Sequence, residues 1–199
     1  TNNIAPGYIA TFSSLKNLLV GYDSDLINSE LINNIPYASL TLKIGRGPKG
    51  LLILESVRNE NYYWLSADSI YLVIKDGRII KTQGLENDLR EVIYPRTSFK
   101  EIMTIGPKQF KAFYSFTNPE LNNLELQFSY LVGEKENIQI LDNSMNLILV
   151  TEEISNRVLG WKLSNKYWVD ENYYVWKSEQ ALTPKIPPFN VEITKKPSM

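Results

Sequence analysis

The chain has 199 residues, a formal net charge of −1, no cysteine and no histidine. Without these residues, thiol nucleophiles, disulfides, zinc–thiolate centres and histidine-based catalytic triads are excluded. The near-neutral charge gives no electrostatic signal for nucleic acid, so no nucleic-acid partner is expected. No zinc, calcium or nucleotide-binding motif occurs, so neither a metal nor a cofactor is expected.

The N-terminal part of the chain has helical patterning. Apolar residues recur at helical spacing near residues 11–20, which predicts a helix there. A second short helix is predicted from Ser29, as its N-cap, to Asn34, because Pro36 prevents its continuation. Residues 1–7 are expected to form an extended segment.

From residue 38 onward, apolar and polar residues alternate, which is typical of strands with one buried and one solvated face. The expected strands are Ala38–Ile44, Leu51–Val57, Tyr62–Ser66, Ile70–Lys75, Arg78–Thr82, Phe110–Phe116, 124–132, Ile138–Leu141, Met145–Ile154, Val158–Leu163, Tyr167–Val169, Tyr173–Ser178 and Phe189–Ile193. A turn at Gly133–Asn137 is expected to separate two of them. Short turns between consecutive strands predict a mainly β fold, an antiparallel meander in a single domain spanning residues 1–199.

Two local signals are sharper than the rest. Asp76-Gly77 between two apolar runs predicts a type I′ hairpin, because both central residues need a positive φ. That hairpin sets Lys75 opposite Arg78. Ser98-Phe99-Lys100-Glu101 fits a capping box and predicts a short helix near residues 99–104.

Trp64, Ser66 and Asp68 occupy alternate positions of one expected strand and therefore share a face. One interpretation is a sugar-binding patch, in which the indole stacks on a pyranose ring and the polar groups bind its hydroxyls. The preferred interpretation is a core tryptophan followed by a turn, because Ser and Asp commonly bond the local backbone in turns.

A second candidate ligand-binding group is aromatic. The aromatic cluster consists of Trp161, Tyr167, Trp168, Tyr173, Tyr174 and Trp176. Within it, Trp168 and Trp176 flank the hairpin around Glu171 and are expected to be cross-strand neighbours. Such aromatic pairs stabilise a sheet, and they could also line a groove for polysaccharide or lipid. Core packing is the preferred interpretation.

A third group consists of carboxylates. A glycoside hydrolase needs two carboxyl groups roughly 5–10 Å apart. Glu152, Glu153, Asp170 and Glu179 lie on neighbouring expected strands, with Glu152 and Glu153 on opposite faces. Carboxylates on half-exposed strands are usually solvated surface, so no catalytic residue is assigned.

Several motifs in a fixed order resemble the YjbF/GfcB family of exopolysaccharide and group 4 capsule-associated bacterial lipoproteins, which includes YmcC-like members. The motifs are Ile35-Pro36-Tyr37-Ala38-Ser39, Tyr63-Trp64-Leu65-Ser66-Ala67-Asp68, Asp76-Gly77-Arg78-Ile79-Ile80-Lys81-Thr82, Gly84-Leu85, Asp88-Leu89, Tyr167-Trp168-Val169-Asp170, Val175-Trp176-Lys177-Ser178-Glu179-Gln180 and Pro187-Pro188. The match is thinnest between residues 86 and 150.

The resemblance implies a large antiparallel sheet, strongly curved or half-barrelled, with a few short helices packed against it. It implies an exported lipoprotein on the periplasmic face of the outer membrane, held by a lipidated Cys immediately before Thr1 that is absent from this chain. The missing initiator Met fits that expectation. Polysaccharide and the envelope proteins that export it are the implied partners, and no enzymatic residue is carried over.

The leading hypothesis is a non-catalytic envelope lipoprotein that assists exopolysaccharide or capsule assembly and export. One alternative is a lipid or lipoprotein carrier that uses an unfilled half-barrel cavity. It would lose support if the helix near residues 11–20 filled the concave face. The other alternative is a carbohydrate-active enzyme that uses carboxylates facing each other across an open cleft.

Overall fold

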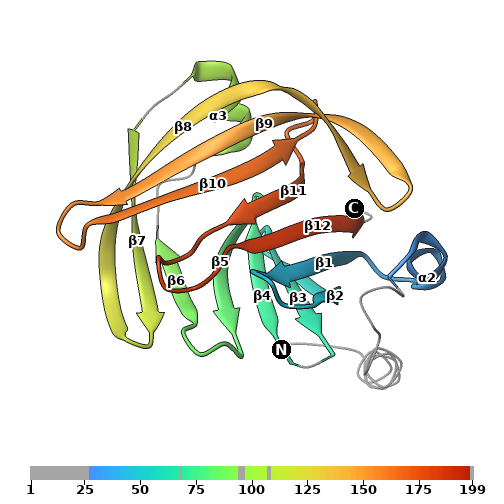
Figure 1. The fold of residues 1–199 in the computed structure, drawn as a ribbon, viewed down its shortest axis with the longest axis horizontal. Helices are drawn as coiled ribbons and strands as arrows, with labels where there is room; N and C mark the ends of the chain where they lie inside the picture. Colours follow the sequence, from blue (N-terminus) through green and yellow to red (C-terminus); the bar gives the residue numbers. More distant parts are fainter. Residues whose placement is uncertain (1–26, 68, 94–96, 107–108, 198–199) are drawn as a thin grey trace.

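The computed structural model describes residues 27–67, 69–93, 97–106 and 109–197. The helix predicted near residues 11–20 and the extended segment 1–7 lie outside these residues. The described residues form one twelve-stranded antiparallel sheet, which curves into a nearly closed barrel with two short helices (Figure 1). The predicted β-class, antiparallel meander and strong curvature are therefore confirmed.

Most strands lie where the alternating pattern predicts them, with three differences: the strand at Leu89–Ile93 was not expected, one strand at Trp161–Val169 replaces the expected Val158–Leu163 and Tyr167–Val169, and the expected Tyr173–Ser178 strand begins only at Val175. The strands are β1 (Ser39–Ile44), β2 (Lys49–Arg58), β3 (Asn61–Ser66), β4 (Tyr71–Lys75), β5 (Arg78–Gln83), β6 (Leu89–Ile93), β7 (Gln109–Thr117), β8 (Glu120–Ile140), β9 (Asn143–Asn156), β10 (Trp161–Val169), β11 (Val175–Gln180) and β12 (Phe189–Lys195). The helices are α2 (Ser29–Asn34) and α3 (Phe99–Ile105). Asn28 caps α2 in place of the expected Ser29, and the capping box of Ser98 and Glu101 on α3 is confirmed.

The sheet closes through its first and last strands. β1 pairs with β12 in antiparallel register, with Leu42 opposite Val191. The strand order is β5-β4-β3-β2-β1-β12-β11-β10-β9-β8-β7-β6, so the two edge strands are β5 and β6, which follow one another along the chain. The opening of the barrel is thus a seam between two consecutive strands.

Side chains join the two edges of this seam where no backbone ladder does. Thr82 Oγ1 donates to Asp88 Oδ1 at 2.9 Å and accepts from the backbone N–H of Leu89 at 2.9 Å. The Asp88 carboxylate also accepts from the backbone N–H groups of Gly84 and Leu85, at 3.1 and 3.2 Å. One carboxylate therefore organises the turn that holds β5 against β6.

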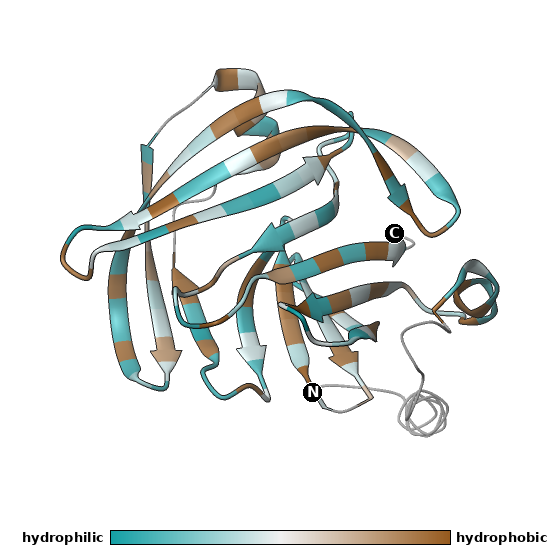
Figure 2. Ribbon diagram, viewed as in Figure 1, coloured by the Kyte–Doolittle hydropathy of each residue, from teal (hydrophilic) through white to brown (hydrophobic). Residues whose placement is uncertain are grey.

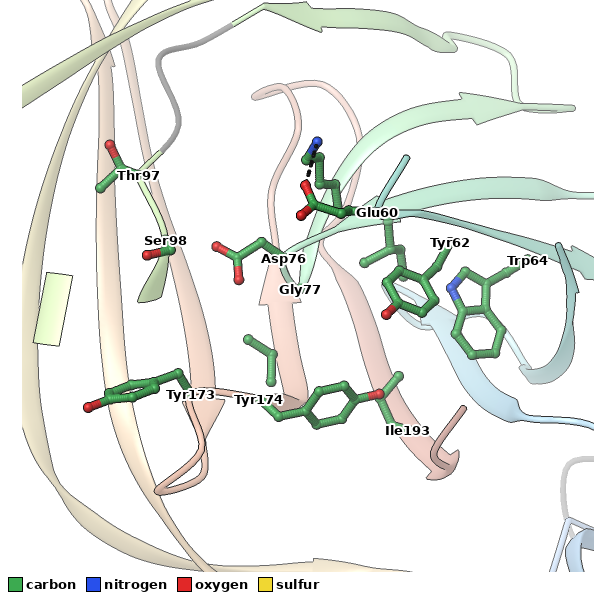
Figure 3. A pocket seen from close by; sticks show the side chains of 13 residues that line it. Glu60, Tyr62, Trp64, Asp76, Gly77, Thr97, Ser98, Tyr173, Tyr174 and Ile193 are labelled. Carbon is green, nitrogen blue, oxygen red and sulfur yellow. Dashed lines mark ion pairs between the residues drawn. The ribbon is translucent and has the colours of Figure 1, made fainter. Parts of the chain in front are cut away.

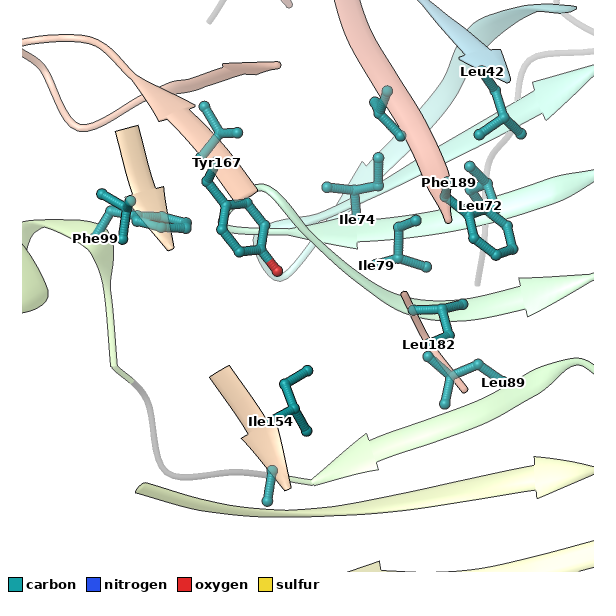
Figure 4. Close-up of a cluster of buried hydrophobic side chains, with 14 of the residues drawn as sticks. Leu42, Leu72, Ile74, Ile79, Leu89, Phe99, Ile154, Tyr167, Leu182 and Phe189 are labelled. Carbon is teal, nitrogen blue, oxygen red and sulfur yellow. The ribbon is translucent and has the colours of Figure 1, made fainter. Parts of the chain in front are cut away.

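The interior of the barrel is packed with apolar side chains. Figure 2 shows hydrophobic and hydrophilic residues alternating along the strands, as the pleat of a half-buried sheet requires. Figure 4 shows residues from distant strands meeting in one cluster, among them Leu72, Ile79, Phe189 and Phe99 of α3. α3 therefore contributes directly to the core.

The Asp76-Gly77 hairpin forms as predicted. Asp76 has φ 46° and Gly77 has φ 71°, and Lys75 pairs with Arg78. The hairpin tip reaches across the interior to β11. A Cβ on Gly77 would lie 2.4 Å from Val175 Cγ2, so this position requires glycine for space as well as for conformation.

The turn expected at Gly133–Asn137 is wrong. β8 continues from Glu120 to Ile140, and its register with β9 shifts between Val132 and Lys135. Gly133 and Glu134 lie opposite the single residue Leu149, so one extra residue forms a bulge, which bends the strand without reversing it. The glycine and the charged residues here are typical of a turn, and they serve equally well in a bulge.

Beyond this bulge, the β8–β9 hairpin supplies side chains that contact Trp168 on the outer face of β10 and the loop that follows β10. Glu136 of β8 accepts a 2.7 Å hydrogen bond from Trp168 Nε1, and Lys135 pairs with Glu171 at 3.0 Å. At the hairpin tip, Leu141 packs against a small second cluster that includes Ile32 of α2. Among the described residues, no helix is both long and apolar enough to cross a membrane.

We expect Asp88→Ala to open the seam. The substitution removes three hydrogen bonds to one carboxylate, and a lost charge-assisted bond costs about 1.5–3 kcal/mol. The free energy of unfolding, measured by urea denaturation, should fall by about 2–3 kcal/mol. Asp142→Ala in the exposed β8–β9 turn is the control, with an expected change within about 0.5 kcal/mol. Equal effects of the two substitutions would show that Asp88 does not hold the seam.

Candidate functional site

A buried ionic network crosses the interior of the barrel. Arg78, the first residue of β5, is 6% exposed, and Glu152 of β9 is 2% exposed. Arg78 Nε donates to Glu152 Oε1 at 3.3 Å, and Arg78 Nη1 donates to Asp76 Oδ2 at 2.8 Å. The guanidinium carbon also lies 4.1 Å from the ring centroid of Phe99. The network thus joins the Asp76-Gly77 hairpin, β9 and α3.

The carboxylate of Glu152 has hydrogen-bond donors on both oxygens. Tyr130 Oη donates to Oε1 at 2.7 Å, and Tyr167 Oη and Asn165 Nδ2 donate to Oε2, each at 2.9 Å. Because a buried charge is costly unless it is paired and hydrogen-bonded, this arrangement explains how the barrel tolerates Glu152 in its core. The sequence-based expectation that Glu152 is solvated surface is wrong. Glu153 does lie on the opposite, exposed face, as predicted.

Burial and charge shift the ionisation of this network in defined directions. Burial alone would lower the pKa of Arg78, but the nearby Tyr130, Glu152, Tyr167 and Asp76 groups raise it well above its ordinary value. Burial, reinforced by the Glu152 charge, raises the pKa of both tyrosines. Arg78 therefore stays a cation, and the two phenols stay neutral hydrogen-bond donors.

Gln180 extends the network to the backbone of the hairpin. Its Oε1 accepts from the N–H of Ile79 at 2.9 Å, and its Nε2 donates to the carbonyl of Gly77 at 3.0 Å. A single side chain of β11 therefore bonds one backbone N–H group and one backbone carbonyl of the hairpin on the opposite part of the sheet. These bonds fix the hairpin tip against β11 and give the network a structural role.

A cavity of about 410 Å³ lies beside the hairpin tip, and we call it the tyrosine cavity (Figure 3). It is lined by Glu60, Tyr62, Trp64, Ile74, Lys75, Asp76, Gly77, Thr97, Ser98, Tyr173, Tyr174, Val175 and Ile193. Aromatic, charged and hydroxyl groups outnumber aliphatic ones in this lining. The volume lies within the range of about 300–1,000 Å³ that is usual for small-molecule sites.

The loop between β10 and β11 is held rigidly around Asp170. Its Oδ1 accepts from the backbone N–H groups of Asn172 and Tyr174, at 2.8 and 2.9 Å. Its Oδ2 accepts from Trp176 Nε1 at 2.9 Å. Asp170 therefore positions the two tyrosines, Tyr173 and Tyr174, that this loop contributes to the cavity.

Ionised groups line the tyrosine cavity as pairs. Glu60 pairs with Lys75 at 3.5 Å, and Asp76 pairs with Arg78 at 2.8 Å. Burial raises the pKa of Asp76 above its ordinary value, although the Arg78 guanidinium opposes the rise. Asp76 therefore belongs both to the cavity wall and to the buried network.

The first predicted ligand-binding group is only partly at this cavity. Trp64 lines it but is 2% exposed, and its Nε1 has no hydrogen-bond partner within the described part of the chain. Ser66 shares the buried face with Trp64, as expected. Its hydroxyl accepts from the N–H of Ile70 at 2.9 Å, which is the turn contact of the preferred interpretation. Asp68 lies outside the described residues.

The two tryptophans of the second predicted group, Trp168 and Trp176, lie on opposite faces of the sheet. Trp168 pairs with Lys177, not with Trp176, so the expectation that the two tryptophans are cross-strand neighbours is wrong. A bulge next to Trp168 shifts the register, and strand alternation then places Trp176 on the other face. Neither is among the residues that line the tyrosine cavity.

Sequence reasoning found part of the cavity and missed part of it. Tyr173 and Tyr174 belong to the aromatic cluster that the sequence offered as a possible groove lining, and both line the cavity. Tyr173, which was expected in a strand, has φ 65°, a conformation that a bulky residue rarely adopts. Tyr62 and Asp76 were missed, because Asp76 was read only as a turn residue and the lining comes from segments far apart along the chain.

No group of three or more acidic side chains suited to a metal ion occurs among the residues that the structure describes. The described carboxylates nearest the cavity are engaged with Lys75 and Arg78. The arrangement thus offers aromatic surfaces, hydroxyl groups and paired charges to a ligand.

We expect Arg78→Met to destabilise the fold by about 3–5 kcal/mol, because it leaves the Glu152 charge buried without its cation. The Arg78→Met, Glu152→Gln double variant should be less destabilised than the sum of the single variants. A double-mutant cycle, followed by urea unfolding, measures this coupling. The exposed pair Lys111–Glu125, with 2.8 Å between charged atoms, is the matched control and should couple by less than about 1 kcal/mol. Equal couplings for the two pairs would contradict the structural role of the buried one.

Comparisons with known proteins agree with this architecture. The solved structure of the hypothetical lipoprotein YmcC from Escherichia coli K12 superposes with a TM-score of 0.78 over 100% of both chains, at 21% identity. The uncharacterized lipoproteins YjbF and GfcB of Escherichia coli K12 are 24% and 22% identical over 177 and 173 residues, in each case 85% of this chain and 81% of the relative. The model of the family described as "Group 4 capsule polysaccharide lipoprotein gfcB, YjbF" matches residues 12–195. The chain therefore belongs to the YjbF/GfcB family of group 4 capsule polysaccharide lipoproteins.

Proposed function

We propose that this protein is a non-catalytic envelope lipoprotein that assists the assembly or export of an exopolysaccharide or capsule. The observation that carries the proposal is the family match across residues 12–195, a family described by its capsule polysaccharide association. The buried network adds support, because its charged groups are committed to holding the fold.

The proposal includes a place in the cell. Two relatives are named lipoproteins, and a lipid anchor upstream of Thr1 would hold the domain at a membrane surface. We place it on the periplasmic face of the outer membrane, where it meets polysaccharide and the envelope proteins that export it. In this proposal, the folded domain makes the contacts with those partners.

A lipid carrier is the second candidate, and the tyrosine cavity is the observation that favours it. The cavity volume of about 410 Å³ is large enough for an apolar chain. Its wall is largely apolar, but the three charged residues Glu60, Lys75 and Asp76 belong to the lining. Burying an acyl chain against paired charges would forgo much of the usual gain from apolar contact.

The genetic test is deletion of the gene in a strain that expresses the neighbouring polysaccharide genes. We expect the amount of surface polysaccharide to fall, because an assembly or export step loses its assisting protein. Complementation with the complete gene should restore it, and staining or sugar analysis of washed cells measures the difference. An unchanged amount of polysaccharide in the deletion strain would contradict the proposal.

The non-catalytic part is tested by incubating the purified protein with the surface polysaccharide of its host. We expect no release of reducing ends, because both ionised carboxylates that line the cavity are ion-paired. A colorimetric assay for reducing sugar gives the readout. Release by the wild type that is lost in a Glu60→Gln, Asp76→Asn double variant would identify a carbohydrate-active enzyme instead.

A further inference from the structure

The tyrosine cavity holds a buried hydrogen-bond donor with no partner. Trp64 is 2% exposed, and its Nε1 makes no hydrogen bond within the described residues, whereas Trp168 and Trp176 each donate to a carboxylate. Buried indole N–H groups usually find a partner, so the exception calls for an explanation. Figure 3 shows the indole nitrogen on the side of Trp64 that faces Tyr62. An acceptor group on a ligand in the cavity would give this donor a partner.

One strained backbone position lies at the same cavity. Glu60, Asp76 and Tyr173 line it with positive φ, at 65°, 46° and 65°, but Glu60 and Asp76 belong to the two-residue β2–β3 and β4–β5 turns, which favour this conformation. Asparagine and aspartate tolerate this conformation, but for tyrosine it is unfavourable. A glycine at position 173 would relieve the strain, so the tyrosine side chain is kept at a cost to stability. Such strain commonly marks a functional site.

The lining matches the chemistry of a sugar ring. A pyranose has apolar C–H faces and a rim of hydroxyl groups. Tyr62, Tyr173 and Tyr174 offer apolar faces with a polar tip, as ligand sites with few but well-placed polar groups require. Beside them, the Asp76 carboxylate, which also pairs with Arg78, supplies an acceptor for hydroxyl groups. The cavity volume of about 410 Å³ suits one or two rings.

The charges of the lining select among sugars. Glu60 and Asp76 are acidic, and Lys75 is the basic residue of the lining set, already paired with Glu60. A uronic acid or a phosphorylated sugar would bring a further negative charge next to these carboxylates, and like charges at close range repel. Neutral sugars meet no such penalty.

We propose that the tyrosine cavity binds one or two rings of a neutral glycan, with Tyr62 and Tyr173 as the contact surfaces and Trp64 Nε1 as a hydrogen-bond donor. The inference rests on the proposed function, because it names the ligand class of a protein that assists polysaccharide assembly or export. Trp64 supplies the buried N–H group that has no partner among the described residues, and Tyr173 is the residue with the unfavourable positive φ.

The test is direct binding by isothermal titration calorimetry, with tryptophan fluorescence as a second readout. The probes are cellobiose, lactose, maltose, N,N′-diacetylchitobiose and an unsaturated hyaluronan disaccharide that carries a uronic acid. We expect at least one neutral disaccharide to bind with a Kd of about 1 mM or tighter. The uronic acid disaccharide should bind more weakly than that neutral sugar.

Two pairs of variants isolate the cavity. Tyr62→Ala should weaken binding about tenfold or more, while Tyr63→Ala should not, because the adjacent Tyr63 side chain packs instead against Tyr71. Tyr173→Gly should weaken binding to a similar extent and leave the melting temperature equal or higher. Asn59→Gly relieves another positive φ, of 51°, at a residue outside the cavity lining, and should not affect binding.

Three results would overturn the inference. They are no binding of any neutral probe at 10 mM (about the weakest affinity of interest), equal losses in Tyr62→Ala and Tyr63→Ala, or tighter binding of the uronic acid disaccharide. Failure of the proposed function has a different signature. There, gene deletion leaves surface polysaccharide unchanged whatever the purified protein binds. In a third case, deletion lowers surface polysaccharide and complementation with the gene of the Tyr62→Ala variant restores it fully. The proposed function then stands, and the cavity has no part in it.

Discussion

The interaction between Arg78 and Glu152 across the barrel interior is the constraint on which the rest of the structure depends. The width of a closed sheet grows with its number of strands, so twelve strands enclose more space than side chains from the wall alone fill easily. Here the Asp76-Gly77 hairpin tip reaches inward until it touches Val175, and Gln180 fastens its backbone. The ion pair and its phenol donors stabilise this crossing, because each charge has a partner inside the low-dielectric interior. The interior is thereby divided into a packed core and the tyrosine cavity.

Asp76 belongs both to the buried network of the packed core and to the wall of the tyrosine cavity. Its carboxylate bonds Arg78 in the network and also lines the cavity, so the charge that a ligand meets is fixed by the group that holds the hairpin. Because burial raises the pKa of Asp76 while Arg78 opposes the rise, a ligand that displaced Arg78 would favour protonation of this carboxyl. A ligand that only donates hydroxyl hydrogens leaves the pairing intact. The geometry of the network therefore favours uncharged polar ligands over anionic ones.

The fold could be predicted further than the site. Period-two patterning located most strands, and the Asp76-Gly77 and Ser98–Glu101 signals gave the correct hairpin and cap, because both depend on neighbours along the chain. The continuity of β8 through Gly133 was missed, since a bulge and a turn share the same residue types. The burial of Glu152 was missed for a different reason: its partner Arg78 lies 74 residues earlier, and no local pattern records that contact. The cavity likewise joins β3, the β4–β5 turn, the residues before α3, the β10–β11 loop and β12.

The divided interior also limits what an envelope protein of this shape can do with a polymer. A glycan that enters the tyrosine cavity meets the hairpin tip and the packed core beyond it, where the buried apolar cluster draws on strands from both halves of the sheet (Figure 4). A polymer in transit would need a continuous polar channel, which the described interior replaces with close-packed side chains. A cavity sized for one or two rings instead fits a chain end or a side branch. Under the proposed function, the barrel would recognise a feature of a polysaccharide, and the polymer itself would pass elsewhere.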